Sequence, residues 1–246
     1  MGEALKVGGL LPPGPLGTGV LDEIITVVRP LVMTALALRR GPQRTLDVDI
    51  DLGGERLFGT VGDVWGNNLV SVSFSNLGAK QRLAAWINSL ALAAGLPDEN
   101  WTAHTIGKHR SGGQVQLVRP LAQHDAQQWL RDLLLLYRAG QREPLPLPVK
   151  TSLAWAEEFR RVSGGAGGDP EMKARSEWET PRFNDSGFPR EDADTWHVRA
   201  FGEAVDYDLL AAPTRAGEAG PHRLGHYAWR LWQPLIDTGN EQIRGL

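Results

Sequence analysis

Two groups of side chains in this sequence have a spacing that suits metal binding. Asp47, Asp49 and Asp51 alternate with aliphatic residues, so on a strand they share one face, about 7 Å apart between neighbours. His222 and His226 are four residues apart and share one face of a helix. The aspartates, however, also form the pattern of a solvated sheet face, and the histidine pair lacks the adjacent glutamate of a zinc-protease helix. We therefore expect no metal ion and no cofactor.

Motifs for nucleotide or nucleophile chemistry are absent. The sequence has no GxxxxGK[ST] phosphate loop, no GxSxG elbow and no cysteine, which fits a reducing cytoplasm. The net charge of −3 gives no general signature of nucleic-acid binding, although a local basic patch stays open. No apolar run is long enough to span a membrane, so we expect a cytoplasmic protein without a membrane partner.

The most informative stretch is residues 59–95, which predicts a strand, a tight turn at Gly66-Asn67-Asn68, a second strand and a long amphipathic helix. Asn76 is the expected N-cap of that helix. One helix face carries apolar residues at helical spacing: Leu83, Trp86, Ile87, Leu90 and Ala94. Many metal-dependent nucleases carry their carboxylates and lysine on such a strand–turn–strand–helix frame.

The remaining elements follow from periodicity. An apolar stripe over residues 21–36 predicts a helix that is kinked or split at Pro30. Further strands are expected at 45–52, 55–65, 69–75, 101–108 and 114–119, and further helices at 122–137, 151–162 and 223–237. We divide the chain into a linker (residues 1–15), a nuclease-like α/β core (16–148) and a helical, loop-rich extension of the same domain (149–246).

The order and spacing of several short motifs resemble the C-terminal domain of RecC, the gamma subunit of exodeoxyribonuclease V (the RecBCD helicase–nuclease). The most specific part is YRAGQREPLPLP at residues 137–148, and the resemblance fades between about 160 and 220. The other matching positions are Leu11-Pro12, Arg29-Pro30-Leu31, Leu57-Phe58-Gly59, Trp86-Ile87, Leu90-Ala91, residues 117–120 and residues 232–235.

The resemblance implies an α/β restriction-endonuclease-like fold of the PD-(D/E)XK type, a mixed sheet flanked by helices, that is catalytically inactive. In the related active nuclease the first hairpin strand carries G-x-x-D and the second carries D-x-K. Here Gly62 stands where the first aspartate belongs, and Asp63 is one residue late, which turns a strand side chain to the opposite face unless a bulge intervenes. Val72 and Phe74 stand where the second carboxylate and the lysine belong. Neither can hold a cation or stabilise developing charge.

We therefore expect a non-catalytic domain that docks RecB-like and RecD-like subunits and shapes the DNA path in double-strand-break repair and recombination, with DNA reached through the complex. Trp229 and Trp232 on the last helix, together with the loop-rich region 160–220, are the candidate contact surfaces, and core packing is the alternative role for both tryptophans. Two other functions stay open: an active metal-dependent nuclease with a rearranged site, and a stand-alone DNA-binding module.

Overall fold

A computed structural model describes residues 14–109, 112–181 and 188–246. Most of the predicted linker therefore lies outside the described residues, and Pro15 already begins the first helix, α2 (Pro15–Leu38). Among the described residues, no helix combines the length and apolar character that crossing a membrane would require.

The centre of the fold is one six-stranded sheet in which the strands lie side by side in sequence order. β3 and β4 run parallel, joined by the crossover helix α3 (Ala79–Gly95), and the other neighbouring strands are antiparallel. The sheet is therefore mixed, as predicted. The strands are β1 (Gln43–Asp51), β2 (Arg56–Trp65), β3 (Asn68–Asn76), β4 (Thr102–His109), β5 (Gly112–Val118) and β6 (Glu241–Gly245).

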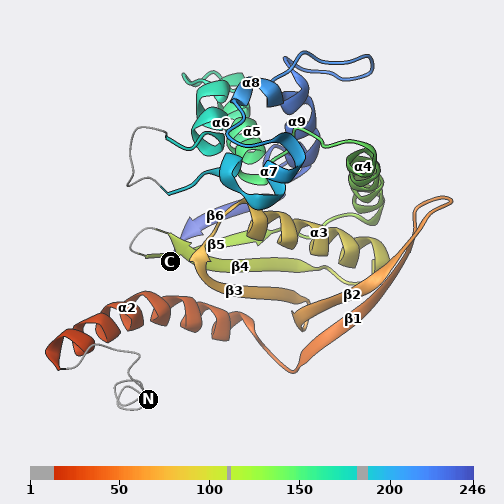
Figure 1. The fold of residues 1–246 in the computed structure, drawn as a ribbon. Helices are drawn as coiled ribbons and strands as arrows, with labels where there is room; N and C mark the ends of the chain where they lie inside the picture. Colours follow the sequence, from red (N-terminus) through yellow and green to blue (C-terminus); the bar gives the residue numbers. More distant parts are fainter. Residues whose placement is uncertain (1–13, 110–111, 182–187) are drawn as a thin grey trace.

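Helices cover both faces of this sheet because the buried strands carry apolar side chains on both sides. On one face, Leu31 and Ala35 of α2 pack against Val70, Ile106 and Val115 of β3, β4 and β5. On the other face α3 contributes to a larger core, and Figure 1 shows α2 and α3 on opposite sides of the strands. Alternate residues of β3 therefore face different helices, which decides where each candidate side chain points.

The rest of the chain forms a group of helices on the α3 side of the sheet (Figure 1). α4 (Gln123–Arg142) packs on α3 through Trp86 and Trp129, whose ring centroids are 5.2 Å apart. Side chains of the later helices join the same core as α3. These helices are α5 (Val149–Ser163), α6 (Pro170–Trp178), α7 (Thr195–Phe201), α8 (Tyr207–Leu210) and α9 (Arg223–Ile236), and the short 3₁₀ helix η1 (Glu191–Ala193) precedes α7.

Two local predictions are wrong, and one element was missed. Gly78, and not Asn76, is the N-cap of α3, because Asn76 is still part of β3 and pairs with Lys108. The predicted split at Pro30 is wrong, because Pro30 lies inside one continuous helix beside the buried Leu31; the alternative, a kink at Pro30, stays a prediction. β6 was not expected, because it is short and largely exposed and so lacks the alternation that identifies a half-buried strand.

Candidate functional site

The two positions on β3 that decide the nuclease question lie on the α2 face of the sheet. Val72 packs against the apolar cluster that includes Leu31 of α2. Phe74 is 51% exposed, and the ammonium group of Lys108 lies 4.4 Å from the centre of its ring. An apolar contact and a cation–π contact therefore occupy the two positions for which the resemblance predicts a metal-binding carboxylate and a lysine in an active nuclease.

Asp63 lies in a β-bulge on β2. Arg44 pairs with Val64 and Leu46 pairs with Val61, so Gly62 and Asp63 together lie opposite a single residue of β1. The φ of Asp63 is +56°, a left-handed conformation that is uncommon outside glycine. The bulge that would redirect this side chain is therefore present, which makes the direction of the carboxylate the decisive question.

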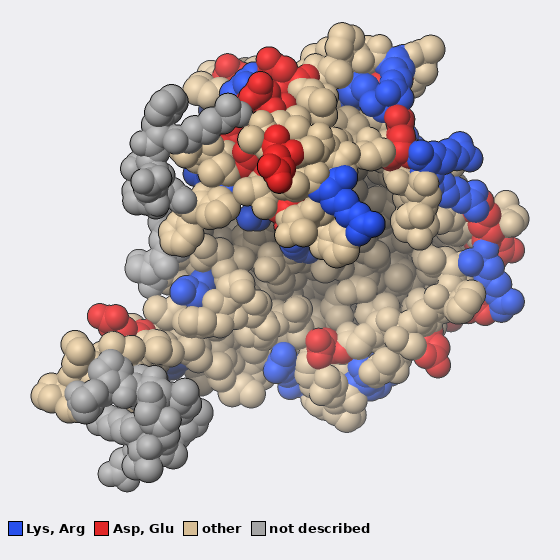
Figure 2. Space-filling view, viewed as in Figure 1, with Lys and Arg blue, Asp and Glu red and all other residues tan. Residues whose placement is uncertain are grey.

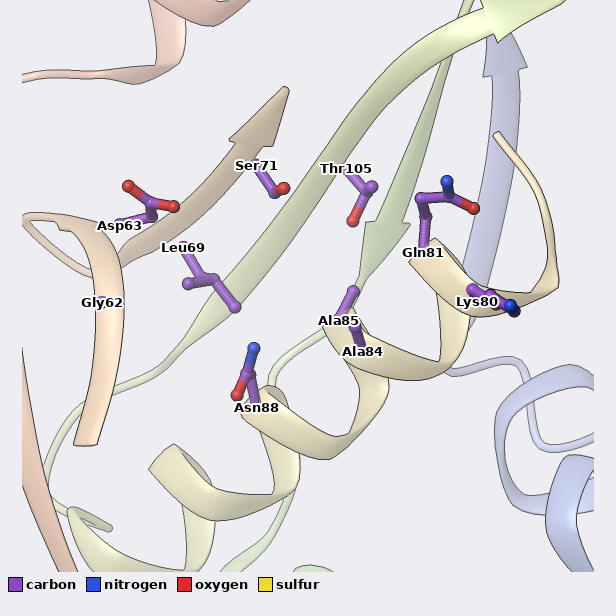
Figure 3. Close-up of a pocket in the computed structure, with 10 residues that line it drawn as sticks. All are labelled: Gly62, Asp63, Leu69, Ser71, Lys80, Gln81, Ala84, Ala85, Asn88 and Thr105. Atoms are coloured by element: carbon purple, nitrogen blue, oxygen red, sulfur yellow. The ribbon is translucent and has the colours of Figure 1, made fainter. Parts of the chain in front are cut away.

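The bulge directs Asp63 away from Val72 and Phe74. Its carboxylate accepts a hydrogen bond of 3.0 Å from Nε2 of Gln43. Asp63 also lines a pocket of about 340 Å³ on the α3 face, together with Ser71 (Figure 3). Ser71 and Val72 are consecutive on β3, so their side chains lie on opposite faces of the sheet. The three candidate positions therefore do not converge on one point.

The pocket beside Asp63 opens where β2 and β3 separate, because these strands share only two residue pairs, Val64 with Leu69 and Trp65 with Asn68. Its charged lining groups are one carboxylate and one lysine. The lining residues are Gly62, Asp63, Leu69, Ser71, Lys80, Gln81, Ala84, Ala85, Asn88 and Thr105 (Figure 3). One carboxylate makes a poor magnesium site, so this pocket lacks the ligands of a two-metal nuclease.

The other metal candidates do not form a site either. The carboxylate of Asp49 pairs with Arg56, whose hydrogen bond lowers the pKa of that aspartate. His222 donates from Nε2 to Glu171 at 2.7 Å, and its Nδ1 accepts from the backbone N–H of Gly225. His226 bonds the backbone of Ala219 instead of sharing a ligand with His222. Within the ranges that the structure describes, no three histidine, aspartate or glutamate side chains are arranged to hold a metal ion.

Sequence reasoning missed a polar centre in the helical part. Glu171 of α6 accepts hydrogen bonds of 2.7 Å each from Trp155 Nε1, Tyr207 Oη and His222 Nε2. Burial opposes its ionisation, but these hydrogen bonds outweigh burial and lower the pKa of Glu171 to about 2. Burial and the same carboxylate raise the pKa of Tyr207. The partners are 16 to 51 residues away in sequence, so no local pattern reveals them.

The two candidate tryptophans of α9 have different environments. Trp232 has no exposed surface, and its Nε1 donates to Ser152 Oγ at 3.0 Å. In this fold Trp232 therefore packs in the core, which was the alternative to partner binding. Trp229 is partly exposed and packs edge-on against Phe159, with ring centroids 5.1 Å apart. Only Trp229 offers surface to a partner while the fold is intact.

Comparison with known proteins identifies the family of this α/β domain. The family model described as the RecC C-terminal domain matches residues 2–160. The RecBCD enzyme subunits RecC of Mycobacterium tuberculosis strains CDC 1551 and H37Rv, and that of Mycolicibacterium smegmatis strain mc(2)155, are each 44% identical over 232 residues. The match covers 93% of this chain and 20% of each relative, so the chain spans about a fifth of their length. The chain belongs to the family of RecC C-terminal domains.

Proposed function

We propose that this chain is a non-catalytic, cytoplasmic domain of a RecC-type subunit, with a restriction-endonuclease-like fold that has lost its nuclease site. In this proposal it docks RecB-like and RecD-like subunits and shapes the DNA path in a RecBCD-type helicase–nuclease that acts in double-strand-break repair and recombination. The family membership and the relatives named RecBCD enzyme subunit RecC support this assignment.

The observation that carries the non-catalytic part is the separation of the candidate residues. Val72 and Phe74 face α2 with no acidic group, whereas Asp63 faces the α3 side and is engaged by Gln43. Two-metal cleavage of a phosphodiester needs carboxylates that converge on the cations. Moving Asp63 to the other face would require the bulge to be rebuilt.

A nuclease assay tests this part directly. The purified chain is incubated with linear duplex DNA and either magnesium or manganese, and we expect no metal-dependent cleavage above a no-protein control. Asp63→Ala is the matched variant, and it should behave like the unmodified chain. Cleavage that needs metal and disappears in Asp63→Ala would establish the alternative, an active nuclease with a rearranged site.

The docking part is supported by apolar side chains left in solvent along α2. Large exposed hydrophobic surfaces often mark protein contacts. Met33 and Leu36 are each 61% exposed, although α2 already packs on the sheet through Leu31 and Ala35. The other exposed apolar side chains of this helix are Leu16, Val20, Ile24, Ile25 and Val32.

Co-purification tests docking. The chain is co-expressed with the RecB-like and RecD-like subunits of the same complex, and we expect it to be recovered with them. Met33→Lys with Leu36→Lys should reduce recovery, because burying two ammonium groups in an apolar contact is costly. Leu135→Lys with Tyr137→Lys, at α4 side chains that are 55% and 64% exposed, is the control. Failure of the unmodified chain to be recovered would contradict the docking role.

A further inference from the structure

The junction between α2 and β1 is basic in a protein whose net charge is negative. Residues 24–46 contain four arginines and no acidic residue. Three of the four, Arg39, Arg40 and Arg44, lie where α2 ends and β1 begins. We propose that these three residues, the junction arginines, bind the phosphodiester backbone of nucleic acid.

Hydrogen bonds hold two of the junction arginines against the turn between β2 and β3. Arg44 donates from Nη2 to the backbone carbonyl of Gly66 at 2.9 Å. Arg39 donates from Nη2 to the carbonyl of Val70 at 3.5 Å, and its guanidinium carbon lies 4.4 Å from the centre of the Trp65 ring. The two guanidinium groups therefore meet the same short segment of the sheet although they come from different elements.

The positive charge of the junction arginines is not neutralised within the described parts of the chain. None of the three forms an ion pair with a described carboxylate, whereas Arg82, Arg223 and Arg230 each do. The carboxylate of Asp63, near this turn, accepts a hydrogen bond from the neutral amide of Gln43. Figure 2 shows basic atoms on both sides of a small acidic group in the lower half of the view, where α2 meets β1.

Most hydrogen-bond donors of the junction arginines stay available. A guanidinium has five N–H donors, and the bonds above use one each on Arg39 and Arg44. On Arg39 the Nε–H is also buried, so the Nη donors are the ones that can reach a ligand. Arg40 uses Nε to reach the carbonyl of Ala37 at 3.2 Å and is exposed, as is Arg44. The planar fork of a guanidinium matches the oxygens of a phosphate, so these free donors suit an anion with several oxygens.

A purely structural role explains only part of this cluster. Arg39 and Arg40 follow the C-terminus of α2, where cations are favoured by the helix dipole and by free carbonyl groups. Arg44 lies on β1 and gains nothing from that dipole. A shared role in anion binding accounts for all three.

The position of the cluster also fits the altered nuclease site. Val70, which Arg39 contacts, lies two residues before Val72 on the same face of β3. On the face of the degenerate positions, Arg39 thus supplies a group that attracts phosphates, whereas Arg44 starts from the α3 face of β1, where it pairs with Val64. This inference goes beyond the docking role, because the chain could dock partner subunits without touching DNA.

A salt titration of the 246-residue chain with labelled single-stranded and duplex DNA tests the proposal. In Arg40→Gln with Arg44→Gln, loss of two phosphate contacts should reduce the salt slope of log K by roughly 1.8 for duplex or 1.4 for single strands. Binding should weaken for every DNA sequence alike, because phosphate contacts carry no sequence information. Arg39 is left in place because it also packs on Trp65.

Arg160→Gln with Arg199→Gln is the matched control, since it removes the same charge from two exposed arginines in the helical part. The proposal requires the control to keep the slope of the unmodified chain. Equal slopes in both variants, or no DNA binding by the unmodified chain, would overturn it. Binding of a polyglutamate peptide in preference to DNA, lost in the junction variant, would also overturn it and assign the surface to an acidic protein segment. Each of these results leaves the co-purification result unaffected.

Discussion

Individual residues on β2 and β3 explain how far the site could be predicted from sequence. Val72 and Phe74 were placed correctly on one strand, because alternation fixes which side chains share a face. The bulge at Asp63 was raised only as a possibility, since no residue pattern states which strand takes the extra residue. Gln43, which donates a hydrogen bond to Asp63, lies 20 residues away in the sequence. The direction of the Asp63 carboxylate could therefore be determined only from the structure.

Replacing the carboxylate of Glu171 should weaken the helical part. In Glu171→Gln, the amide oxygen can still accept from Trp155 and His222, but the charge that strengthens those bonds is lost. We expect a loss of about 1 kcal/mol in the free energy of unfolding, measured by urea denaturation at pH 7. Glu177 lies on the same helix, and its side chain forms none of the described hydrogen bonds. Glu177→Gln should therefore change the free energy of unfolding by less than about 0.5 kcal/mol.

The same carboxylate should make stability sensitive to acid. Hydrogen bonds lower the pKa of Glu171 from 4.5 to about 2, so the stabilisation is complete above pH 4.5 and is lost as the pH falls toward 2. The stability difference between the unmodified chain and Glu171→Gln should therefore shrink across this range. A difference that stays constant down to pH 2 would contradict the role given to the ionised carboxylate.

His104 on β4 should produce a second pH effect, nearer neutrality. Burial lowers its pKa below the ordinary value of 6.5, and the nearby charge of Arg244 adds to the shift. The unfolded chain then takes up a proton below pH 6.5 that the folded chain resists, so stability falls as the pH drops. One proton sets a limit of about 1.4 kcal/mol per pH unit. His104→Gln should flatten the urea-unfolding profile between pH 6.5 and 5; an unchanged profile would show that other groups cause the slope.

At the scale of elements, sequence periodicity was sufficient wherever an element buries one long face. The first five strands and helices α3, α4, α5 and α9 were all expected. The missed elements, β6 and the short helices α6, α7 and α8, contain at most nine residues each, too few to establish a period. Their positions depend on tertiary contacts such as the donors around Glu171, which local patterns do not record.

The contact between α5 and α9 gives a test of element packing. A Cβ added at Gly225 of α9 would lie 2.9 Å from Trp155 Cζ2 on α5. Trp155 cannot move aside easily, because it bonds Glu171 and stacks on Phe159 at 4.7 Å. We expect Gly225→Ala to cost about 1–3 kcal/mol of unfolding free energy. Gly19→Ala in α2 meets no atom within 4 Å and should instead stabilise by about 0.5–1 kcal/mol, the usual gain over glycine in a helix.

At the scale of the whole molecule, β6 links the part beyond residue 148 to the sheet. The division at residue 148 stays a prediction, but the chain returns after α9 to add an edge strand to β5. The return is fixed by a buried polar network. Arg82 of α3 binds Glu241 of β6 through Nε at 2.8 Å and through Nη2 at 2.5 Å, and it binds Glu157 of α5 at 2.6 Å. Gln116 of β5 donates to Glu241 at 2.7 Å.

Removing Glu241 should therefore weaken the whole molecule and not only its edge strand. The side chains of Arg82 and Glu241 are each 7% exposed, so Glu241→Ala leaves a buried guanidinium that only Glu157 still compensates. We expect a loss of about 3 kcal/mol in one cooperative urea transition, because the network joins α3, α5, β5 and the edge strand β6. Gln242→Ala, an exposed neighbour on β6, should have almost no effect. Adding Arg82→Met to Glu241→Ala should recover part of the loss, since no unpaired charge then stays buried. If Glu241→Ala instead splits unfolding into two transitions, the helical part is an independent unit and β6 does not unite the fold.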